Sequence, residues 1–590
     1  NLVINGGGSL NLLGSNALSL NGSISGAGDL TKNGAGTLTL NGANALTGSF
    51  NLAGGALALG AGGSLSPTGA MTLGVGTTLD LTAAANQTIG SLAGLGGTVN
   101  LGSHTLTLGG LGDTSYSGTF GAGTGGLIKQ GIGVQTLSGV NNLSGGVALN
   151  AGGLLLGNVA ALGSGTLSVG GNATLDGTTG LALTNAVNLG AGASLNLLGN
   201  QALTFNGVIG GAGGLIKNGA ATLTLNGVNT FGGGLALNAG SLVLGNGGAL
   251  GAGALNVGGA VSLDASTGLT VGNGITLGAG GSLNVLGSNA LTLGGGIGGT
   301  GSLVKNGAAT LTLGGANTFT GGLAINAGKV AVGSGGSLAA GGAVSLAGMG
   351  ADLDISLGGN QTIGALSGIA GSTVTLGSST LTFGDATNQT FAGVIGGTGG
   401  LVKQGSGVQT LTGANTFSGG SNLAAGGLVL GNAGALGSGA LTVSGNGSLD
   451  TTAALNLGNA INLGAALTLP GSQNLTLAGN ITGTGSLVKN GASTLTLNGT
   501  NTFSGGLSAN AGSLLLGNSG ALGTGTLGIG GSVSLDGGVP LNLLNNVSLG
   551  AGAALSLPGS QAITLGGVVS GAGRLVKNGA TTLTLNGANS

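Results

Sequence analysis

One long motif recurs along the whole chain, and this repetition restricts the possible folds more than any other feature. Residues 215–246 read LIKNGAATLTLNGVNTFGGGLALNAGSLVLGN, and residues 487–518 read LVKNGASTLTLNGTNTFSGGLSANAGSLLLGN. A lysine near the start of each copy recurs at spacings of 97, 88, 88, 98, 86 and 88 residues. One long unit is followed by two short ones, twice, so a second period of 272–273 residues lies above the first. The seven lysines are Lys32, Lys129, Lys217, Lys305, Lys403, Lys489 and Lys577.

Within a unit, polar and apolar residues alternate with a period of two. Thr222-Leu223-Thr224-Leu225 is one example, and 275–277 and 291–293 are others. Alternation of this kind places Leu, Ile and Val on one face of a β-strand. The runs are short, and glycine-rich turns separate them about every eight residues, which leaves no room for helical crossovers. The pattern predicts an all-β fold, a parallel β-helix or β-solenoid with about three short strands per rung.

The same spacing predicts the size of a rung. Three strands with their turns need about 22 residues, so a unit of 88 residues makes about four rungs, and the chain makes about 25. No shift in composition separates ordinary domains. We therefore expect residues 1–590 to be one continuous β-solenoid segment of a longer chain. Its units start near residues 30, 127, 215, 303, 401, 487 and 575.

The charge content excludes several classes of partner. Lys and Arg number 9, Asp and Glu number 10, and charged residues are 3% of the chain. Nucleic-acid binding requires clustered basic residues, which this sequence does not have. No apolar run reaches the length of a spanning helix, so we expect no direct membrane insertion of this segment. A nearly neutral surface favours self-association, end to end or laterally.

The string KNGAATLTLNGVNTFGGGLALNAGSLVLG, residues 217–245, resembles the autotransporter-associated β-strand repeat. The stretch GAGALNV at 251–257 is similar in style. The resemblance implies a right-handed parallel β-helix in the passenger of a bacterial autotransporter or a related large surface protein. It also implies a location at the cell surface or outside the cell, either anchored in the outer membrane or secreted.

Few residues could carry chemistry. His104 is the only histidine, and Ser378 stands at the equivalent position 274 residues later, so we interpret His104 as a surface side chain. Asp352 and Asp354 form the only Asp-x-Asp, and alternation places both carboxylates on one side of a strand. Paired carboxylates can serve glycoside hydrolysis or bind a cation. No basic or aromatic residue adjoins them in the sequence, so we favour a structural role.

One aspartate recurs in most units, 47–49 residues after the lysine. Two rungs separate such residues, too far for a direct ion pair. We interpret the lysines and aspartates as solubilising side chains that mark the register, with complementary packing between neighbouring molecules as the alternative. The aspartates are Asp80, Asp176, Asp264, Asp354, Asp450 and Asp536.

Two further residue types recur at fixed positions. Phe231, Phe319, Phe417 and Phe503 follow Asn-Thr, and burial favours a core or turn-capping role over an exposed aromatic ladder. An asparagine follows the register lysine in most copies, where a turn is expected. Such asparagines can form amide ladders or adopt left-handed conformations. They are Asn33, Asn218, Asn306, Asn490 and Asn578.

These features predict a non-enzymatic structural or adhesive rod on the bacterial surface or in the extracellular matrix, with self-assembly into filaments as one form of it. We expect no catalytic residue, cofactor-binding residue or metal ligand. Adhesion to a host cell or surface would act through regions outside this segment. The alternative is a polysaccharide-acting β-helix enzyme or a carbohydrate-binding surface protein.

Overall fold

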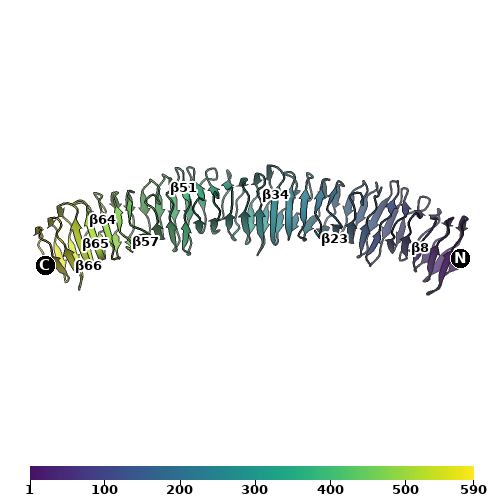
Figure 1. Ribbon diagram of the computed structural model, residues 1–590, viewed down its shortest axis with the longest axis horizontal. Helices are drawn as coiled ribbons and strands as arrows, with labels where there is room; N and C mark the ends of the chain where they lie inside the picture. Colours follow the sequence, from purple (N-terminus) through teal and green to yellow (C-terminus); the bar gives the residue numbers. More distant parts are fainter. The chain divides into compact units, whose positions relative to one another are not determined.

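The computed structural model describes residues 1–590 as 73 short β-strands without a helix. The chain divides into two compact units, Asn1–Gly295 and Gly296–Ser590. Within each unit the strands stack turn upon turn, and every strand lies parallel to its neighbours (Figure 1). The predicted all-β parallel solenoid is therefore confirmed. No helix is present that could cross a membrane.

Three sheets run side by side through the later part of the first unit, and the chain visits them in turn. The first holds β12 (Gln87–Ile89), β15 (Thr105–Leu108), β18 (Gly126–Lys129), β20 (Val147–Leu149), β22 (Leu167–Val169), β25 (Val187–Leu189) and β28 (Ile209–Gly211). The second holds β16 (Thr114–Tyr116), β19 (Val134–Leu137), β21 (Gly152–Leu156), β23 (Ala173–Gly177), β26 (Ser194–Leu197), β29 (Gly214–Lys217), β31 (Leu235–Leu237), β33 (Leu255–Val257) and β36 (Ile275–Leu277). The third holds β24 (Leu181–Leu183), β27 (Leu203–Phe205), β30 (Thr222–Leu225), β32 (Gly240–Leu244), β34 (Ala260–Ala265) and β37 (Ser282–Val285).

The second unit is built in the same way. One of its sheets holds β46 (Gln361–Thr362), β49 (Leu381–Phe383), β52 (Leu401–Lys403), β54 (Ser421–Leu423), β56 (Leu441–Val443), β59 (Ile461–Leu463) and β62 (Ile481–Gly483). Another contains β43 (Lys329–Val332), β45 (Asp352–Asp354), β48 (Thr373–Thr375) and β51 (Val394–Gly396). Near its C-terminus, β65 (Leu507–Leu516) and β66 (Leu527–Gly537) are longer and continue from one face onto the next.

The core consists of columns of aliphatic side chains, one residue per turn. Leu223 pairs with Leu203 of the preceding turn and with Leu242 of the next, and all three are at most 2% exposed. The alternating Thr222 and Thr224 face outward, as the period of two predicts. Paired residues are 19–23 apart in sequence, most often 20–22, so the chain makes about 29 turns instead of the 25 expected from longer rungs.

The length of the sequence repeat is not a whole number of solenoid turns. The column that starts at Lys129 continues through Leu149, Val169 and Leu189 to Gly211, which is four turns. The next register lysine, Lys217, lies six residues further along and belongs to the neighbouring sheet. In the second unit, Lys403 is followed by four turns to Gly483, and Lys489 again lies six residues beyond. A short repeat therefore makes four turns and advances by one face.

Candidate functional site

The register lysine is an inward-facing residue. Lys217 pairs with Leu197 of the preceding turn and with Leu237 of the next, so its aliphatic stem occupies a leucine column. It is 1% exposed. Lys129 lies in the same way between Leu108 and Leu149. Six of the seven register lysines are buried: Lys32, Lys129, Lys217, Lys305, Lys403 and Lys489.

The ammonium group of each buried lysine donates to backbone carbonyls at the corner that follows its strand. Lys217 Nζ donates to the oxygen of Gly219 in its own turn and, at 3.3 Å, to that of Ala239 in the next. Lys489 makes the same two contacts, with Gly491 at 2.6 Å and with Ala511 at 2.9 Å. One cation thus joins two successive corners. The interpretation of these lysines as solubilising surface charges is wrong.

Burial makes the protonated form of these lysines less favourable than it is in water. It lowers the pKa of Lys217, and the nearby carboxylate of Asp176 offsets part of this effect. Burial likewise lowers the pKa of Lys305 and of Lys489. The recurring Asp and Lys form no ion pair, as the sequence predicted: the only salt bridges are those of Lys329.

Three of the recurring aspartates, Asp176, Asp264 and Asp450, connect successive turns. Asp264 accepts hydrogen bonds from the backbone of Ser288 at 3.1 Å and from its hydroxyl at 2.5 Å, one turn later. Asp450 accepts the same two bonds from Ser472. Asp176, 3% exposed, accepts from the side chain of Asn200 at 2.5 Å. A carboxylate in this position connects its strand end to the loop below.

At the Asn-Thr-Phe motif, the asparagine side chain makes hydrogen bonds to the backbone of the adjacent turns, in place of the hydrogen bonds between strands. The Asn229 oxygen accepts from the amide of Ile209 in the turn above at 2.8 Å, and its nitrogen donates to Ala249 in the turn below at 2.6 Å. Phe231 is fully buried beside it. The core role predicted for the phenylalanines is confirmed, since all four are at most 2% exposed. The sequence interpretation missed the buried asparagine, although its fixed position two residues before Phe was a usable signal.

Asparagines that follow the register lysine form amide ladders on the surface. Asn218 donates to Asn196 at 2.8 Å and accepts from Asn238 at 2.7 Å. Asn33, Asn306 and Asn490 pair with another asparagine one turn away, and Asn578 pairs with Ser556. The predicted ladders are confirmed. The left-handed alternative is wrong, because only glycines have positive φ.

The Asp-x-Asp pair lies on strand β45, with both carboxylates on its outer side around the buried Leu353. The expectation that no basic residue accompanies the pair is wrong. Lys329 on the neighbouring strand β43 lies 3.1 Å from Asp352 and 2.8 Å from Asp354. Its hydrogen bond to Asp354 raises the pKa of Lys329. Partial burial acts to raise the pKa of Asp354, but bonds from Lys329 and Ser356 hold it below its ordinary value.

Asp352 has further partners on the next strand. The hydroxyls of Thr373 and Thr375 donate to it at 2.9 and 3.2 Å. Lys329 thus lies between two carboxylates, each of which also accepts hydrogen bonds from a serine or threonine. Together, Lys329, the two aspartates and the threonines connect three successive turns. His104 lies far along the chain from this cluster, half-buried in the turn before β15.

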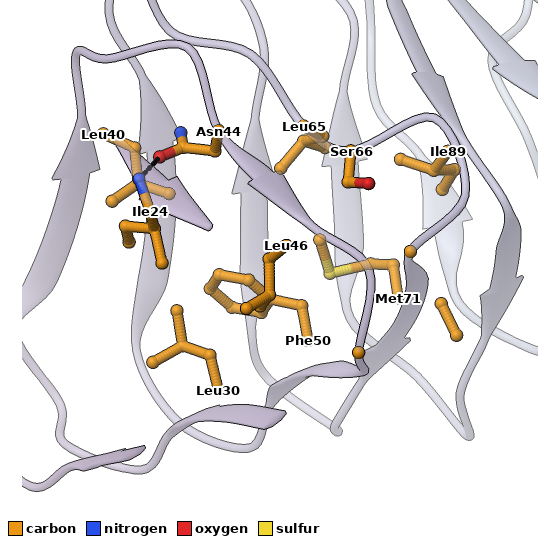
Figure 2. A pocket seen from close by; sticks show the side chains of 13 residues that line it. Ile24, Leu30, Leu40, Asn44, Leu46, Phe50, Leu65, Ser66, Met71 and Ile89 are labelled. Atoms are coloured by element: carbon orange, nitrogen blue, oxygen red, sulfur yellow. Dashed lines mark hydrogen bonds between the residues drawn. The ribbon is translucent and has the colours of Figure 1, made fainter. Parts of the chain in front are cut away.

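One interior hollow lies in the first repeat, between Asn44 and Met71 (Figure 2). It has a volume of about 30 Å³ and a lining that is mostly apolar. Asn44 accepts from the amide of Ile24 at 2.8 Å, as the buried asparagines of later repeats do. Leu46 stands where later copies have phenylalanine, and Phe50 stands where they have Leu235 or Leu323. We attribute the hollow to this exchange of a phenylalanine and a leucine between the two positions.

The fold and its recurring corners define a class, the parallel β-solenoids built from long repeats whose polar side chains connect successive turns. A family model, the passenger-associated-transport-repeat, matches seven segments: 30–59, 127–156, 215–244, 303–332, 401–430, 487–516 and 575–590. Each segment starts two residues before a register lysine. The chain carries this repeat again and again along its length, and the resemblance to autotransporter passenger repeats inferred from the sequence is confirmed. No curated protein and no solved structure matches the chain.

Proposed function

We propose that this chain is a non-enzymatic structural part of a bacterial autotransporter passenger or a related surface protein, displayed outside the cell. The repeat family is that of surface or secreted proteins, and it recurs from residue 30 to residue 590. Within this role the solenoid provides a stable exported scaffold that spaces other parts of the protein away from the membrane.

The observation that best supports a structural role is how the reactive side chains are used. Five of the six buried lysines donate to carbonyls of two turns, as Lys217 does, and the asparagine two residues before the buried phenylalanine joins three turns, as Asn229 does. Three of the six recurring aspartates accept from the following turn. The residue types that could act on a substrate are engaged in holding one turn to the next.

Antibodies raised against the purified chain would test the location. We expect them to label intact cells of the source organism, and protease added outside these cells to remove the signal. Labelling that requires lysis of the cells would contradict the proposal.

The enzymatic alternative centres on Asp352 and Asp354 and has its own test. The purified chain and its D352N/D354N variant would be incubated with neutral and acidic polysaccharides, and reducing ends would be measured. We expect no release by either protein, because Lys329 and the threonine hydroxyls occupy both carboxylates. Release by the native chain that the variant loses would overturn the structural proposal.

Self-association is a second proposal within the structural class. It is supported by the net charge of −1 and by the 3% content of charged residues, which leave little electrostatic repulsion between molecules. Sedimentation velocity over a concentration series would test it. We expect species larger than the monomer to grow with concentration and to persist at high salt, and a single monomeric species throughout would contradict it.

A further inference from the structure

The outer face of the second sheet in the first unit carries an elongated hollow. Its volume is about 360 Å³. The lining residues come from five successive turns, one to three from each, so the hollow runs along the stack of turns and not along a strand. Five turns at the usual strand spacing span roughly 19 Å. The lining is Ile132, Gly152, Asn172, Ala173, Thr174, Ser194, Asn196 and Ile216.

A second hollow of about 300 Å³ runs beside the first on the same sheet. The two share Thr174, which lies at the centre of the face between Gly153 and Asn196. The second hollow also crosses five turns, from Asp113 to Asn200. Together they form one broad groove, which we call the axial groove.

The polar groups of the axial groove differ between its two sides. On the first side, the oxygen of Asn172 accepts from Ser194, and that of Asn196 accepts from Asn218. The amide nitrogens of Asn172 and Asn196 have no partner within the protein, so two donors one turn apart face the groove. On the other side lie the carboxylates of Asp113 and Asp176.

The apolar parts of the groove are aliphatic. Ile132 and Ile216 lie at the two ends of the first hollow, and Leu155 and Leu198 line the second. No lysine or arginine lines either hollow. The groove therefore has donors, acceptors and aliphatic surface, but its only charges are negative. Lys129 and Lys217 lie behind the two carboxylates, but the lining itself offers polyanions such as nucleic acids and acidic polysaccharides no cation to pair with.

We propose that the axial groove binds a neutral, extended glycan whose sugar units follow the stack of turns. Sugar hydroxyls both donate and accept, so they can accept from Asn172 and Asn196 and donate to Asp113. The C–H faces of the sugar rings pack on Ile132, Ile216 and Leu198. This inference goes beyond the structural role and holds wherever the chain is located.

Titration calorimetry of the full chain with neutral hexasaccharides of β-linked glucose, xylose and mannose tests the proposal. We expect at least one of them to bind, and the galacturonic acid hexasaccharide not to bind. In the T174R variant, a long side chain fills the centre of the groove, and affinity should fall by about tenfold or more.

The chain provides a matched control. Thr276 lies in the same outward column as Thr174, further along the same sheet, and outside both hollows. T276R makes the same substitution and should leave binding unchanged. N196D should weaken binding because it removes the donor but keeps the ladder oxygen, whereas N256D, in the same column, should not.

Three outcomes would overturn the proposal. They are no binding by any neutral hexasaccharide, equal binding by native chain and T174R, and preferential binding of the acidic hexasaccharide. Circular dichroism of each variant shows whether the solenoid is intact, and N196D provides a second reading should T174R perturb its sheet.

Discussion

At the scale of single residues, the repeat depends on a lysine that the solenoid places in its core. Burying an ammonium ion costs free energy, which the carbonyls of two corners offset in part. The aliphatic stem meanwhile fills a position in a leucine column, as Lys217 does between Leu197 and Leu237. The side chain therefore contributes both packing and hydrogen bonds, and substitutions can separate the two contributions.

Lys217→Ala should lower the local free energy of unfolding by about 2–5 kcal/mol, because it removes the stem from a packed column. Lys217→Met keeps the stem and should cost less, since its main penalty is the loss of a donor to two carbonyls. Hydrogen exchange of the amides in strands β26, β29 and β31 measures this. Lys329→Ala, at a half-exposed position, is the control and should cost at most about 1 kcal/mol. Unchanged exchange in Lys217→Ala would contradict the role described.

The pH dependence of stability follows from the same burial. The pKa of each buried lysine is lower in the folded chain than the ordinary value of 10.5. Below the folded pKa the cost of burying the charge is fully present; it begins to fall as the pH rises through that pKa and is gone above the unfolded value. Between the folded pKa and 10.5 the unfolded chain binds more protons, so stability rises with pH.

We therefore expect the midpoint of thermal unfolding to rise as the pH rises from neutral toward the ordinary lysine pKa, and to rise less in Lys217→Met. Tyr116 has the opposite effect at higher pH. Burial raises the pKa of Tyr116, so its phenol ionises first in the unfolded chain, and stability should fall above about pH 10. A midpoint that falls steadily from pH 7 would contradict the lysine assignment.

Asn229 should be the most sensitive polar residue of its turn. Asn229→Ala leaves the amide of Ile209 and the carbonyl of Ala249 buried without partners, at about 1–3 kcal/mol each. Asn226 lies three residues earlier in an exposed ladder, with one bond of 2.8 Å to Asn206. Asn226→Ala should therefore cost less than about 1 kcal/mol. Hydrogen exchange at Ile209 measures both, and equal effects would contradict the distinction.

At the scale of elements, the strands are short and the corners differ in how they are filled. The first repeat shows this difference, with Leu46 and Phe50 in place of a phenylalanine and a leucine (Figure 2). Phe231→Leu should open a similar gap and cost about 1–2 kcal/mol. The double variant Phe231→Leu/Leu235→Phe reproduces the first repeat and should recover part of that loss. Urea unfolding, followed by hydrogen exchange of the amides in strands β30 and β31, compares the stability of the two variants. A double variant that is no more stable than the single variant would show that the two positions are independent.

The alternating strands could be predicted from the sequence because alternation depends on adjacent residues. The amide ladders could be predicted because an asparagine recurs at the same position in most repeats. The direction of the register lysine could not. Lys217 ends an alternating run, Gly214–Lys217, in which the odd positions face inward, and its charge suggested solvent instead. The partner of Asp352 was missed for another reason. Lys329 precedes it by 23 residues, and only the length of that particular turn brings the two together.

At the scale of the whole molecule, the unit that can be removed without damage is the turn. Deleting residues 187–208 would place Ile209 where Val187 was, with the inward and outward faces unchanged. We expect this variant to keep its strand content by circular dichroism and to resist limited proteolysis. Deleting 187–197, about half a turn, would mismatch all three sheets and should leave a protease-sensitive region. Equal resistance of both variants would contradict a stack held by register.

A repeat of four turns and one further face has a consequence for how genes of this kind change in length. Recombination between two copies adds or removes a whole repeat, because the copies are similar in sequence. Since every such copy ends where the next sheet begins, the new junction resembles the old ones, and pairing continues without a misfit. Each event nevertheless assigns all later copies to a different sheet. Copy number can therefore vary while the fold persists, and each variation reorients whatever the later copies present to their surroundings.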